Sequence, residues 1–336
     1  MIILSNCLTR TADEGSLNIA NSLIRRIKRA KPETTVVSYE RHAAWSDMHL
    51  PINKFLLNGM LIRLIREKKE PVLYVPFPTR MLPAALRIFI LSRFARRGLR
   101  TMLVMQGTMG RLAGWLIKHS GAEILTVSRS SWETYREIIG SRAVYLRTGV
   151  DTKRFAPVDE EKKAALREKY GLPQDKPIVL HVGHMNPGRN IGCMLELDES
   201  WHGVLVVSTT TAGGQDMQLR RKFAEKSNIK LLDTYCPAIE EIYQLSDVYL
   251  FPVVETGHCI DVPLSALEAA SCGIPVVTTA YGEMQELTEK KGFYQIESFD
   301  PAALNDLLER ALAERISPRE SVLEYDWNIA VEFLLL

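Results

Sequence analysis

The chain has 336 residues, of which 46% are hydrophobic and 24% are charged. This composition is typical of a globular protein and excludes disordered, collagen-like and coiled-coil chains, and the length favours two domains. The formal net charge of +2 hides two opposite halves. Residues 1–150 hold 24 Lys and Arg against 10 Asp and Glu, whereas residues 151–336 hold 18 against 30. This asymmetry indicates two surfaces that face different partners.

The sequence shows no clear signal for disulfide bonds, for secretion or for insertion into a membrane. The five cysteines are scattered and form no Cys-x-x-Cys pair, so neither a disulfide framework nor a structural metal site is expected. The N-terminal segment lacks the basic region and the apolar length of a signal peptide. No stretch reaches the roughly 18 apolar residues of a membrane span. We therefore expect a cytoplasmic protein that does not span a membrane.

Strand-like and helix-like segments alternate along the whole chain. In the first half, short apolar runs predict strands at Ile2–Leu4, Thr35–Ser38, Val72–Val75, Met102–Met105 and Ile124–Val127, the last followed by a helix with Ser128 or Ser130 as N-cap. In the second half, strands are expected at Ile178–Val182, Gly203–Val207, Ile229–Leu232, Val248–Phe251 and Pro275–Thr278, and an amphipathic helix at Pro301–Glu314. The alternation predicts an α/β fold class with two doubly wound parallel sheets.

Ligands of such sheets bind beyond the carboxyl ends of the strands, so we expect phosphate-binding residues in the loops that follow the strands. The first loop has one glycine, Gly15, where a helix begins, and a phosphate can approach free amides there. An ordinary turn glycine is the alternative, because the loop lacks the glycine pattern of a dinucleotide site and the Lys-Ser/Thr of a P-loop. In the second half, Gly183 ends a strand, where its small size gives a phosphate close access to the backbone, and Arg189 follows within reach of that phosphate. A solvent-facing Arg189 is the alternative.

Glu268 lies in an otherwise apolar helical segment, between Leu267 and Ala269. A carboxylate in such a place is costly unless it has a partner. A pair of sugar hydroxyls would satisfy it, and a solvated Glu in the middle of a helix is the alternative. The glycine and the buried strand that follow, Gly273-Ile-Pro-Val-Val, complete the most informative segment of the chain.

These motifs, in this order, resemble the retaining glycosyltransferases of the GT-B fold, specifically family 4, the glycosyl transferases group 1. The resemblance is carried by Thr148-Gly-Val-Asp-Thr-Lys-Arg-Phe155, Val182-Gly-His, Leu267-Glu-Ala with Gly273-Ile-Pro-Val-Val, and Tyr325-Asp-Trp327. It extends from Ser128 to the C-terminal segment, whereas residues 1–127 match mainly by pattern.

The resemblance implies two Rossmann-like domains that face a central cleft. Residues 1–155 would bind the acceptor, residues 156–318 the nucleotide-sugar, and residues 319–336 would form a helix that crosses back to the first domain. The implied activity is transfer of a sugar, with retention of configuration, from a nucleotide-diphosphate-sugar to a glycan or a lipid-linked acceptor. The chain has no Asp-x-Asp motif, so we expect no metal and no cofactor.

The resemblance also assigns donor-binding residues. Glu268 would bind the ribose hydroxyls, and Arg189 matches the phosphate-binding Lys of the family. The amides of Leu264 and Ser265 would cap the diphosphate at a helix N-terminus, and Gly15 matches a glycine that approaches the same group from the first domain.

This sequence departs from the family pattern at several positions. His184, after Gly183, replaces an Arg, and a neutral imidazole is a weaker phosphate ligand unless the diphosphate raises its pKa. The usual first acid falls on no carboxylate, which leaves Asp261 as first choice and Glu255 as the alternative. Gln106 stands where the family has a His, and we place it with Arg80 on the acceptor side of the cleft. Asp261, Glu268 and Arg189 are the expected catalytic set.

The basic half has no sharp motif, but much of its charge lies in Arg25–Lys31, Arg63–Lys69 and Arg80–Arg100. The last stretch mixes apolar and basic residues, as does a helix on an anionic membrane, where each basic residue contributes about 1 kcal/mol. The alternative is a helix whose Leu86, Ile90 and Phe94 face its own core. The charge fits an anionic membrane or a lipid-phosphate acceptor.

Three other functions remain open. A sugar-nucleotide epimerase has the same architecture, and a non-catalytic member of the family would bind the sugar-nucleotide alone. A nucleic-acid-binding protein would fit the basic half, but the sequence has no known DNA or RNA module, so we expect no nucleic acid as a partner.

Overall fold

The computed structural model describes residues 1–8, 15–39, 43, 45–52, 58–77, 81–105, 107–207, 216–255, 257 and 259–336. The chain divides into two compact units. The first consists of Met1–Thr148 together with Trp327–Leu336, and the second consists of Gly149–Asp326. Each unit has its own parallel sheet.

In the described part of the first unit, the sheet has seven parallel strands in the order β3-β2-β1-β4-β5-β6-β7. The strands are β1 (Ile2–Ser5), β2 (Thr35–Ser38), β3 (Met48–His49), β4 (Val72–Val75), β5 (Leu99–Leu103), β6 (Glu123–Thr126) and β7 (Ala143–Tyr145). All residues of β1, β2 and β4 are buried, as expected for strands covered on both faces.

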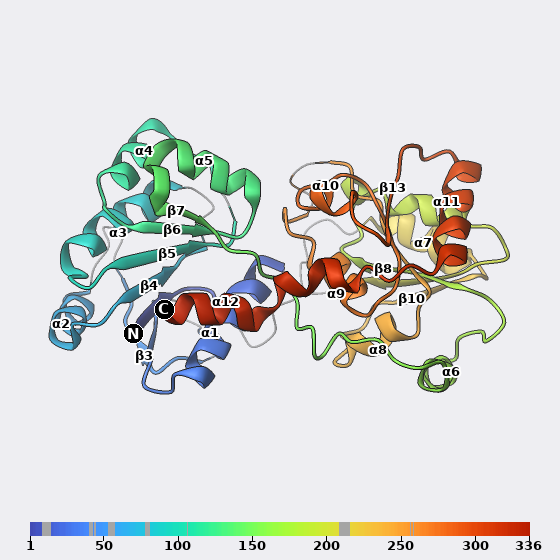
Figure 1. Cartoon of the computed structure of the whole chain (residues 1–336), viewed down its shortest axis with the longest axis horizontal. Helices are drawn as coiled ribbons and strands as arrows, with labels where there is room; N and C mark the ends of the chain where they lie inside the picture. Colours follow the sequence, from blue (N-terminus) through green and yellow to red (C-terminus); the bar gives the residue numbers. More distant parts are fainter. Residues whose placement is uncertain are drawn as a thin grey trace. The chain divides into compact units, whose positions relative to one another are not determined.

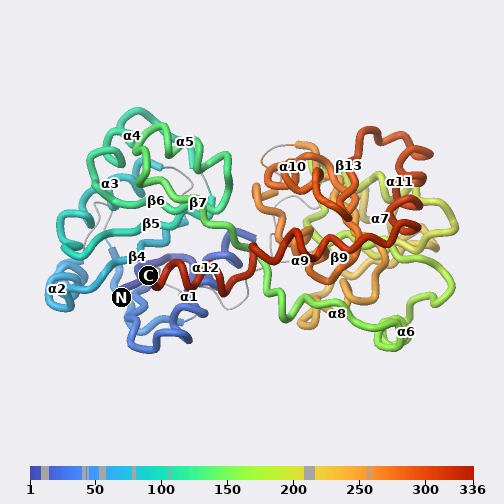
Figure 2. The backbone as a smooth tube through the Cα atoms, in the orientation of Figure 1, coloured from blue at the N-terminus to red at the C-terminus, as the bar shows by residue number. Residues whose placement is uncertain are grey.

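Helices cover both faces of this sheet. They are α1 (Gly15–Ala30), α2 (Gly59–Lys68), α3 (Met81–Phe94), α4 (Arg111–Lys118), α5 (Arg129–Ile139) and the C-terminal α12 (Trp327–Leu335). Figure 1 shows α3, α4 and α5 on one face and α1 beside α12 on the other, and the tube of Figure 2 shows the same pairing of the chain's two ends. Of the two expected N-caps of α5, the structure selects Ser128, whose hydroxyl accepts from the amide of Ser131.

In the described part of the second unit, six parallel strands follow the order β10-β9-β8-β11-β12-β13. The strands are β8 (Ile178–Gly183), β9 (His202–Val207), β10 (Ile229–Leu232), β11 (Val248–Phe251), β12 (Val276–Thr278) and β13 (Phe293–Gln295). The α-helices are α6 (Glu160–Lys169), α7 (Met217–Glu225), α8 (Ile239–Gln244), α9 (Leu264–Ser271), α10 (Met284–Leu287) and α11 (Pro301–Glu314), and the longer 3-10 segments are η3 (Ile191–Glu196) and η4 (Arg319–Tyr325). A core between the sheet, α7, α11 and η3 holds one face together.

Both sheets have the doubly wound order, in which the chain starts in the middle and reverses direction once. The reversal lies between β1 and β4 in the first sheet and between β8 and β11 in the second. The predicted fold class is thereby confirmed, and α11 has the predicted bounds. Ligands bind at such reversal points because the loops on either side diverge there.

Three short edge strands, β3, β7 and β13, were not predicted, and β5 begins earlier than the predicted Met102. The reason at β5 is a charged residue inside the strand. Arg100 pairs in register with Glu123 of β6, and their side chains form an ion pair at 2.8 Å. A prediction from apolar residues alone therefore places the start of β5 too late in the sequence.

The junction between the units lies at Thr148–Gly149, against the predicted 155–156, and the chain re-enters the first unit at Trp327, against the predicted 319. Gly149 explains the first difference, because a Cβ there would lie 2.8 Å from Leu267 Cδ1 of α9. The hydroxyl of Ser271, also on α9, donates to the carbonyl of Phe155 at 2.6 Å. The segment 149–155 is thus packed onto the second unit.

The stretch Arg80–Arg100 contains α3, and its apolar face belongs to the core. Residues spaced three and four apart are buried there, namely Met81, Ala84, Ala85, Ile88 and Leu91. Leu86 and Phe94 are partly buried and pack against the same core. Of the two interpretations of this stretch, packing against the protein's own core therefore describes this buried face, whereas Leu82 is exposed.

Candidate functional site

The candidate site lies at the carboxyl edge of the second sheet, at its reversal point. Two segments border this point, residues 184–190 after β8 and residues 252–263 after β11. The amide of Glu255 donates to the carbonyl of Gly188 at 3.4 Å, so the two segments are joined. Sequence reasoning placed most of its donor-binding residues in or beside these two segments.

Arg189 lies at the end of a 3-10 turn, Pro187–Arg189, and is only 7% exposed. The side chain of Asn186 caps the turn by accepting from the amide of Arg189 at 3.2 Å. The guanidinium folds back over Gly183, where Nη1 of Arg189 occupies the space that a Cβ would need. The alternative of a solvent-facing Arg189 is therefore wrong.

A buried histidine, His181, lies beside Arg189, because side-chain atoms of both residues approach the Cβ position of Gly183. Its Nδ1 donates to the carbonyl of Leu250 at 2.8 Å, which makes Nε2 the unprotonated nitrogen. Burial and the charge of Arg189 lower the pKa of His181 to about 3, so the ring is neutral. Nε2 has no hydrogen-bond partner among the described residues. Sequence reasoning missed this residue, although a histidine inside an apolar strand was a visible signal.

Glu268 lies on α9 and is half-buried. The hydroxyl of Tyr243 on α8 donates to its Oε2 at 2.9 Å. Burial raises the pKa of Glu268 to about 7, while the hydrogen bond from Tyr243 and the charge of Arg154 favour the ionised form. Tyr243 satisfies one oxygen of the carboxylate and leaves acceptor capacity on the other. When it is ionised, the half-buried carboxylate of Glu268 is therefore suited to accept hydrogen bonds from two hydroxyl groups.

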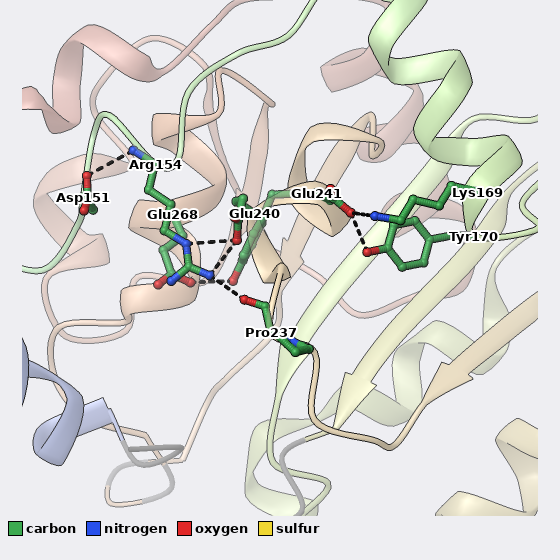
Figure 3. A network of polar contacts seen from close by, with 9 residues as sticks. Asp151, Arg154, Lys169, Tyr170, Pro237, Glu240, Glu241 and Glu268 are labelled. Carbon is green, nitrogen blue, oxygen red and sulfur yellow. Dashed lines mark hydrogen bonds and ion pairs between the residues drawn. The ribbon is translucent and has the colours of Figure 1, made fainter. Parts of the chain in front are cut away.

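Arg154 approaches Glu268 from the segment 149–155 (Figure 3). Its Nε and Nη2 donate to Oε2 of Glu240 at 2.9 and 2.6 Å. Nη2 also donates to the carbonyl of Pro237 at 2.9 Å. Three segments that are distant in sequence thus meet around Glu268. Arg154 stands in the motif Thr148–Phe155, but sequence reasoning assigned it no role.

Asp261 is half-buried, and the backbone around it is held from a neighbouring segment. Its carbonyl accepts from the amide of Glu283 at 2.8 Å. Gly282 has φ +54°, and a Cβ there would collide with the carbonyl of Asp261. Glu255, the alternative carboxylate, is exposed. The loop that leads to α9 is therefore fixed at Asp261.

The N-terminus of α9 follows directly. Pro263 is the N-cap residue and makes no side-chain cap, so no side chain at that position competes for the first amides of the helix. Leu264 is buried and Ser265 is half-buried. His184, directly after β8, is half-buried as well.

The remaining expected residues belong to the first unit. Gly15 is the first residue of α1, so it begins a helix as expected. Gln106 and Arg80 lie outside the described residues. Within the part of the chain that is described, no group of three or more His, Cys, Asp or Glu residues is arranged to hold a metal ion.

Comparison with known families decides what kind of domain this site belongs to. Residues 176–314 match the model of the family Glycosyl transferases group 1, and this range contains Gly183, Arg189, Asp261 and Glu268. The second unit contains a glycosyl transferases group 1 domain. The resemblance of the sequence motifs to the glycosyl transferases group 1 is thereby confirmed for this range of residues.

Two curated relatives are named as mannosyltransferases that act on phosphatidylinositol monomannosides. The GDP-mannose-dependent alpha-(1-6)-phosphatidylinositol monomannoside mannosyltransferase of Mycolicibacterium smegmatis is 29% identical over 60% of this chain and 58% of its own length. The GDP-mannose-dependent monoacylated alpha-(1-6)-phosphatidylinositol monomannoside mannosyltransferase of Corynebacterium glutamicum is 26% identical over 63% of this chain and 61% of its own length. The match thus spans about three-fifths of these relatives.

Solved structures match over nearly the whole chain. A glycosyltransferase from Rickettsia africae superposes with a TM-score of 0.77 at 13% identity, over 99% of this chain and 96% of that one. HepE from Anabaena, in complex with UDP-glucose, superposes with a TM-score of 0.71 at 16% identity, over 100% of this chain and 98% of that one. The chain has the GT-B fold, with one parallel-sheet α/β domain in each unit.

Proposed function

We propose that the protein is a retaining glycosyltransferase that moves a sugar from a nucleoside-diphosphate-sugar to a glycan or a lipid-linked acceptor. The observation that carries the proposal is Glu268, a half-buried carboxylate at the edge of a glycosyl transferases group 1 domain, with one oxygen bound by Tyr243. The cis-diol of a ribose has two adjacent hydroxyl donors, which suit the acceptor capacity that remains.

The diphosphate of the donor would lie between Arg189 and the N-terminus of α9. Arg189 is already fixed by its turn and by the packing over Gly183, so little ordering is needed when an anion binds. The amides of Leu264 and Ser265 add the positive end of the helix dipole. His184 would contact the same group, and Gly15 would approach it from the first unit.

In the proposed reaction the bond from the anomeric carbon to the diphosphate breaks, and a bond to the acceptor hydroxyl forms on the same face of the sugar. The hydroxyl proton goes to the departing diphosphate. Arg189 and the helix amides stabilise the negative charge that develops there, which is the largest contribution the protein makes. Asp261 would orient the donor sugar. We propose that this proceeds without a metal ion.

The acceptor would be bound by the first unit, which carries the positive charge of the chain. The two curated relatives are named for phosphatidylinositol-based acceptors, and such an acceptor is anionic and lies in a membrane. Within the described residues, no helix has the length and apolar character needed to cross a membrane. Contact from one side is therefore the proposed mode of access.

We place that contact on α4. Leu112 and Trp115 of this helix are 58% and 52% exposed, and Arg111 and Lys118 mark its two ends. Exposed apolar side chains next to cations are suited to the headgroup region of an anionic membrane.

The test is product analysis with UDP- and GDP-sugars and lipid acceptors, with and without EDTA. Formation of an α-linked product from an α-linked donor, unaffected by EDTA, is expected. Conversion of the donor to an epimer without acceptor would instead identify an epimerase, and donor binding without any turnover would identify a non-catalytic family member.

A further inference from the structure

Arg154 is the residue in this region that the proposed function does not explain. It lies in the segment 149–155, and both Nε and Nη2 of its guanidinium donate hydrogen bonds. Glu240, at the start of α8, accepts from Nε and Nη2, and the carbonyl of Pro237 accepts from Nη2 (Figure 3). The Arg154 side chain is 44% exposed, but these three hydrogen bonds give its guanidinium a defined position.

The position of Arg154 matters because its positive charge affects the ionisation of Glu268. Glu268 is half-buried, and burial disfavours its ionised form. The charge of Arg154 acts in the opposite direction, whereas the carboxylate of Glu240 repels Glu268. Glu240 therefore holds Arg154 in place and, without Arg154, would penalise the ionised form of Glu268 further.

A protonated Glu268 would be a poor ligand for ribose. An ionised carboxylate accepts from both hydroxyls of the diol in charge-assisted hydrogen bonds, whereas a carboxylic acid offers one weaker acceptor and a donor. The ionisation of Glu268 thus decides whether the ribose is recognised.

We propose that Arg154 is a positioning residue for the donor: held by Glu240 and Pro237, it keeps Glu268 ionised for the ribose hydroxyls and ties the segment after β10 to the ribose site. The inference rests on the proposed function of Glu268 and deepens it. It assigns donor recognition to an ion pair between residues 86 positions apart in the sequence, Arg154 and Glu240.

The other ionisable groups near Glu268 do not replace Arg154. From α8, Tyr243 donates to Glu268 and Glu240 repels it. On its own helix Cys272 follows at the C-cap, and from β11 Tyr249 packs beside Tyr243. Arg319 of η4 donates to the carbonyl of Ser271 at the other end of α9. Among the described residues, Arg154 is the cation whose charge lowers the pKa of Glu268.

The test uses UDP and GDP together with their 2′-deoxy forms, which lack one of the two ribose hydroxyls. Dissociation constants are measured by calorimetry between pH 6 and pH 9. In the wild type we expect the deoxy form to bind about tenfold more weakly or worse at high pH, since a hydrogen bond to a charged group is lost. This discrimination should decrease as the pH falls through about 7.

In Arg154→Met the midpoint of this decrease should move upward by about one pH unit or more, with the discrimination restored near pH 9. Arg154→Lys keeps the charge and should stay closer to the wild type. The matched control is Lys169→Met. Lys169 forms an ion pair with Glu241, which lies next to Glu240 on α8, but Lys169 is directed away from Glu268 (Figure 3). An Arg154→Met profile equal to those of the wild type and the control would overturn the inference.

A second readout separates this inference from the proposed function. The pKa of Glu268 is measured in the unliganded protein by carboxyl ¹³C NMR, assigned with Glu268→Gln, in the wild type and in Arg154→Met. A raised pKa in Arg154→Met supports the role of Arg154 even if no nucleotide binds, whereas an unchanged pKa overturns it. If the wild type binds no nucleoside diphosphate, the proposed function fails. Melting curves of each variant verify that it is folded.

Discussion

The guanidinium of Arg189 lies over Gly183, in the space that a side chain at position 183 would occupy. Sequence reasoning gave Gly183 a different role, in which its small size allows a phosphate to approach the backbone. In the structure the glycine first allows Arg189 to fold back against the end of β8. The two residues therefore form one feature, and each should be sensitive to changes in the other.

Gly183→Ala should weaken binding of UDP and GDP about as much as Arg189→Ala does, because the new methyl group displaces the guanidinium. We expect a loss of about tenfold to a hundredfold, the size of a charged hydrogen-bond contact. Binding is measured by calorimetry. Gly192→Ala is the control, since a Cβ there would meet Leu219 at an ordinary 3.7 Å. Full binding by Gly183→Ala would contradict the assignment of Arg189.

Glu268→Gln should stabilise the fold at high pH and leave it unchanged at low pH. The folded protein keeps the proton of Glu268 up to a pKa of about 7, while the unfolded chain releases it near 4.5. The folded state thus binds more protons in this interval, and its stability falls as the pH rises from 4.5 to 7. The Gln side chain of the variant does not titrate, so it avoids this loss in the free energy of unfolding, which amounts to at most about 3 kcal/mol at pH 8.

Urea unfolding at pH 4 and pH 8 measures the effect. Glu309→Gln, at an exposed position of α11, is the control and should change nothing at either pH. A stability difference for Glu268→Gln that is the same at both pH values would show that Glu268 titrates normally. The same variant should lose the discrimination between ribose and deoxyribose nucleotides.

Asp247→Ala should destabilise the second unit by about 3 kcal/mol, as expected when one partner of a buried ion pair is removed. Asp247 accepts from Lys163 at 2.6 Å, from Arg167 at 2.5 Å and from the amide of Ile178 at 2.6 Å. It lies at the amino ends of β8 and β11, opposite the candidate site, so nucleotide affinity of the folded protein should be kept.

The matched control for Asp247 is an exposed pair in the first unit. Glu133 forms an ion pair with Arg129 at 3.3 Å, and both side chains are more than half exposed. Glu133→Ala should cost less than about 0.5 kcal/mol. Thermal unfolding measures both variants, and equal effects would contradict the argument from burial.

Leu112→Ser combined with Trp115→Ser should reduce binding to vesicles that contain anionic lipid by about tenfold or more, because burial of each side chain contributes about 1.5–3 kcal/mol. Flotation with and without anionic lipid measures the bound fraction. Met217→Ser is the control, since Met217 is similarly exposed, at 57%, but lies on α7 of the second unit. Equal binding of wild type and variant, or indifference to lipid charge, would exclude α4 as the contact.

The sequence was sufficient where the signal is local. Buried strands are continuous apolar runs and α11 has a clear helical period, so the doubly wound architecture could be predicted without a structure. Glu268 was recognisable because a carboxylate between apolar residues on one helix needs a partner. The stretch Arg80–Arg100 could be interpreted in two ways, since a helix that faces a core and one that faces a membrane have the same pattern.

Only the tertiary structure decided what these side chains meet. It showed that Arg189 packs over Gly183, that Tyr243 binds Glu268, and that Arg154 pairs with Glu240. It also assigned Gly149–Phe155 to the second unit. Periodicity records whether a residue is buried but not which residue faces it, because loops bring partners together from distant parts of the chain. The opposite charges of the two halves were visible in the sequence, whereas the effect of the Arg154 charge on Glu268 could be identified only from the fold.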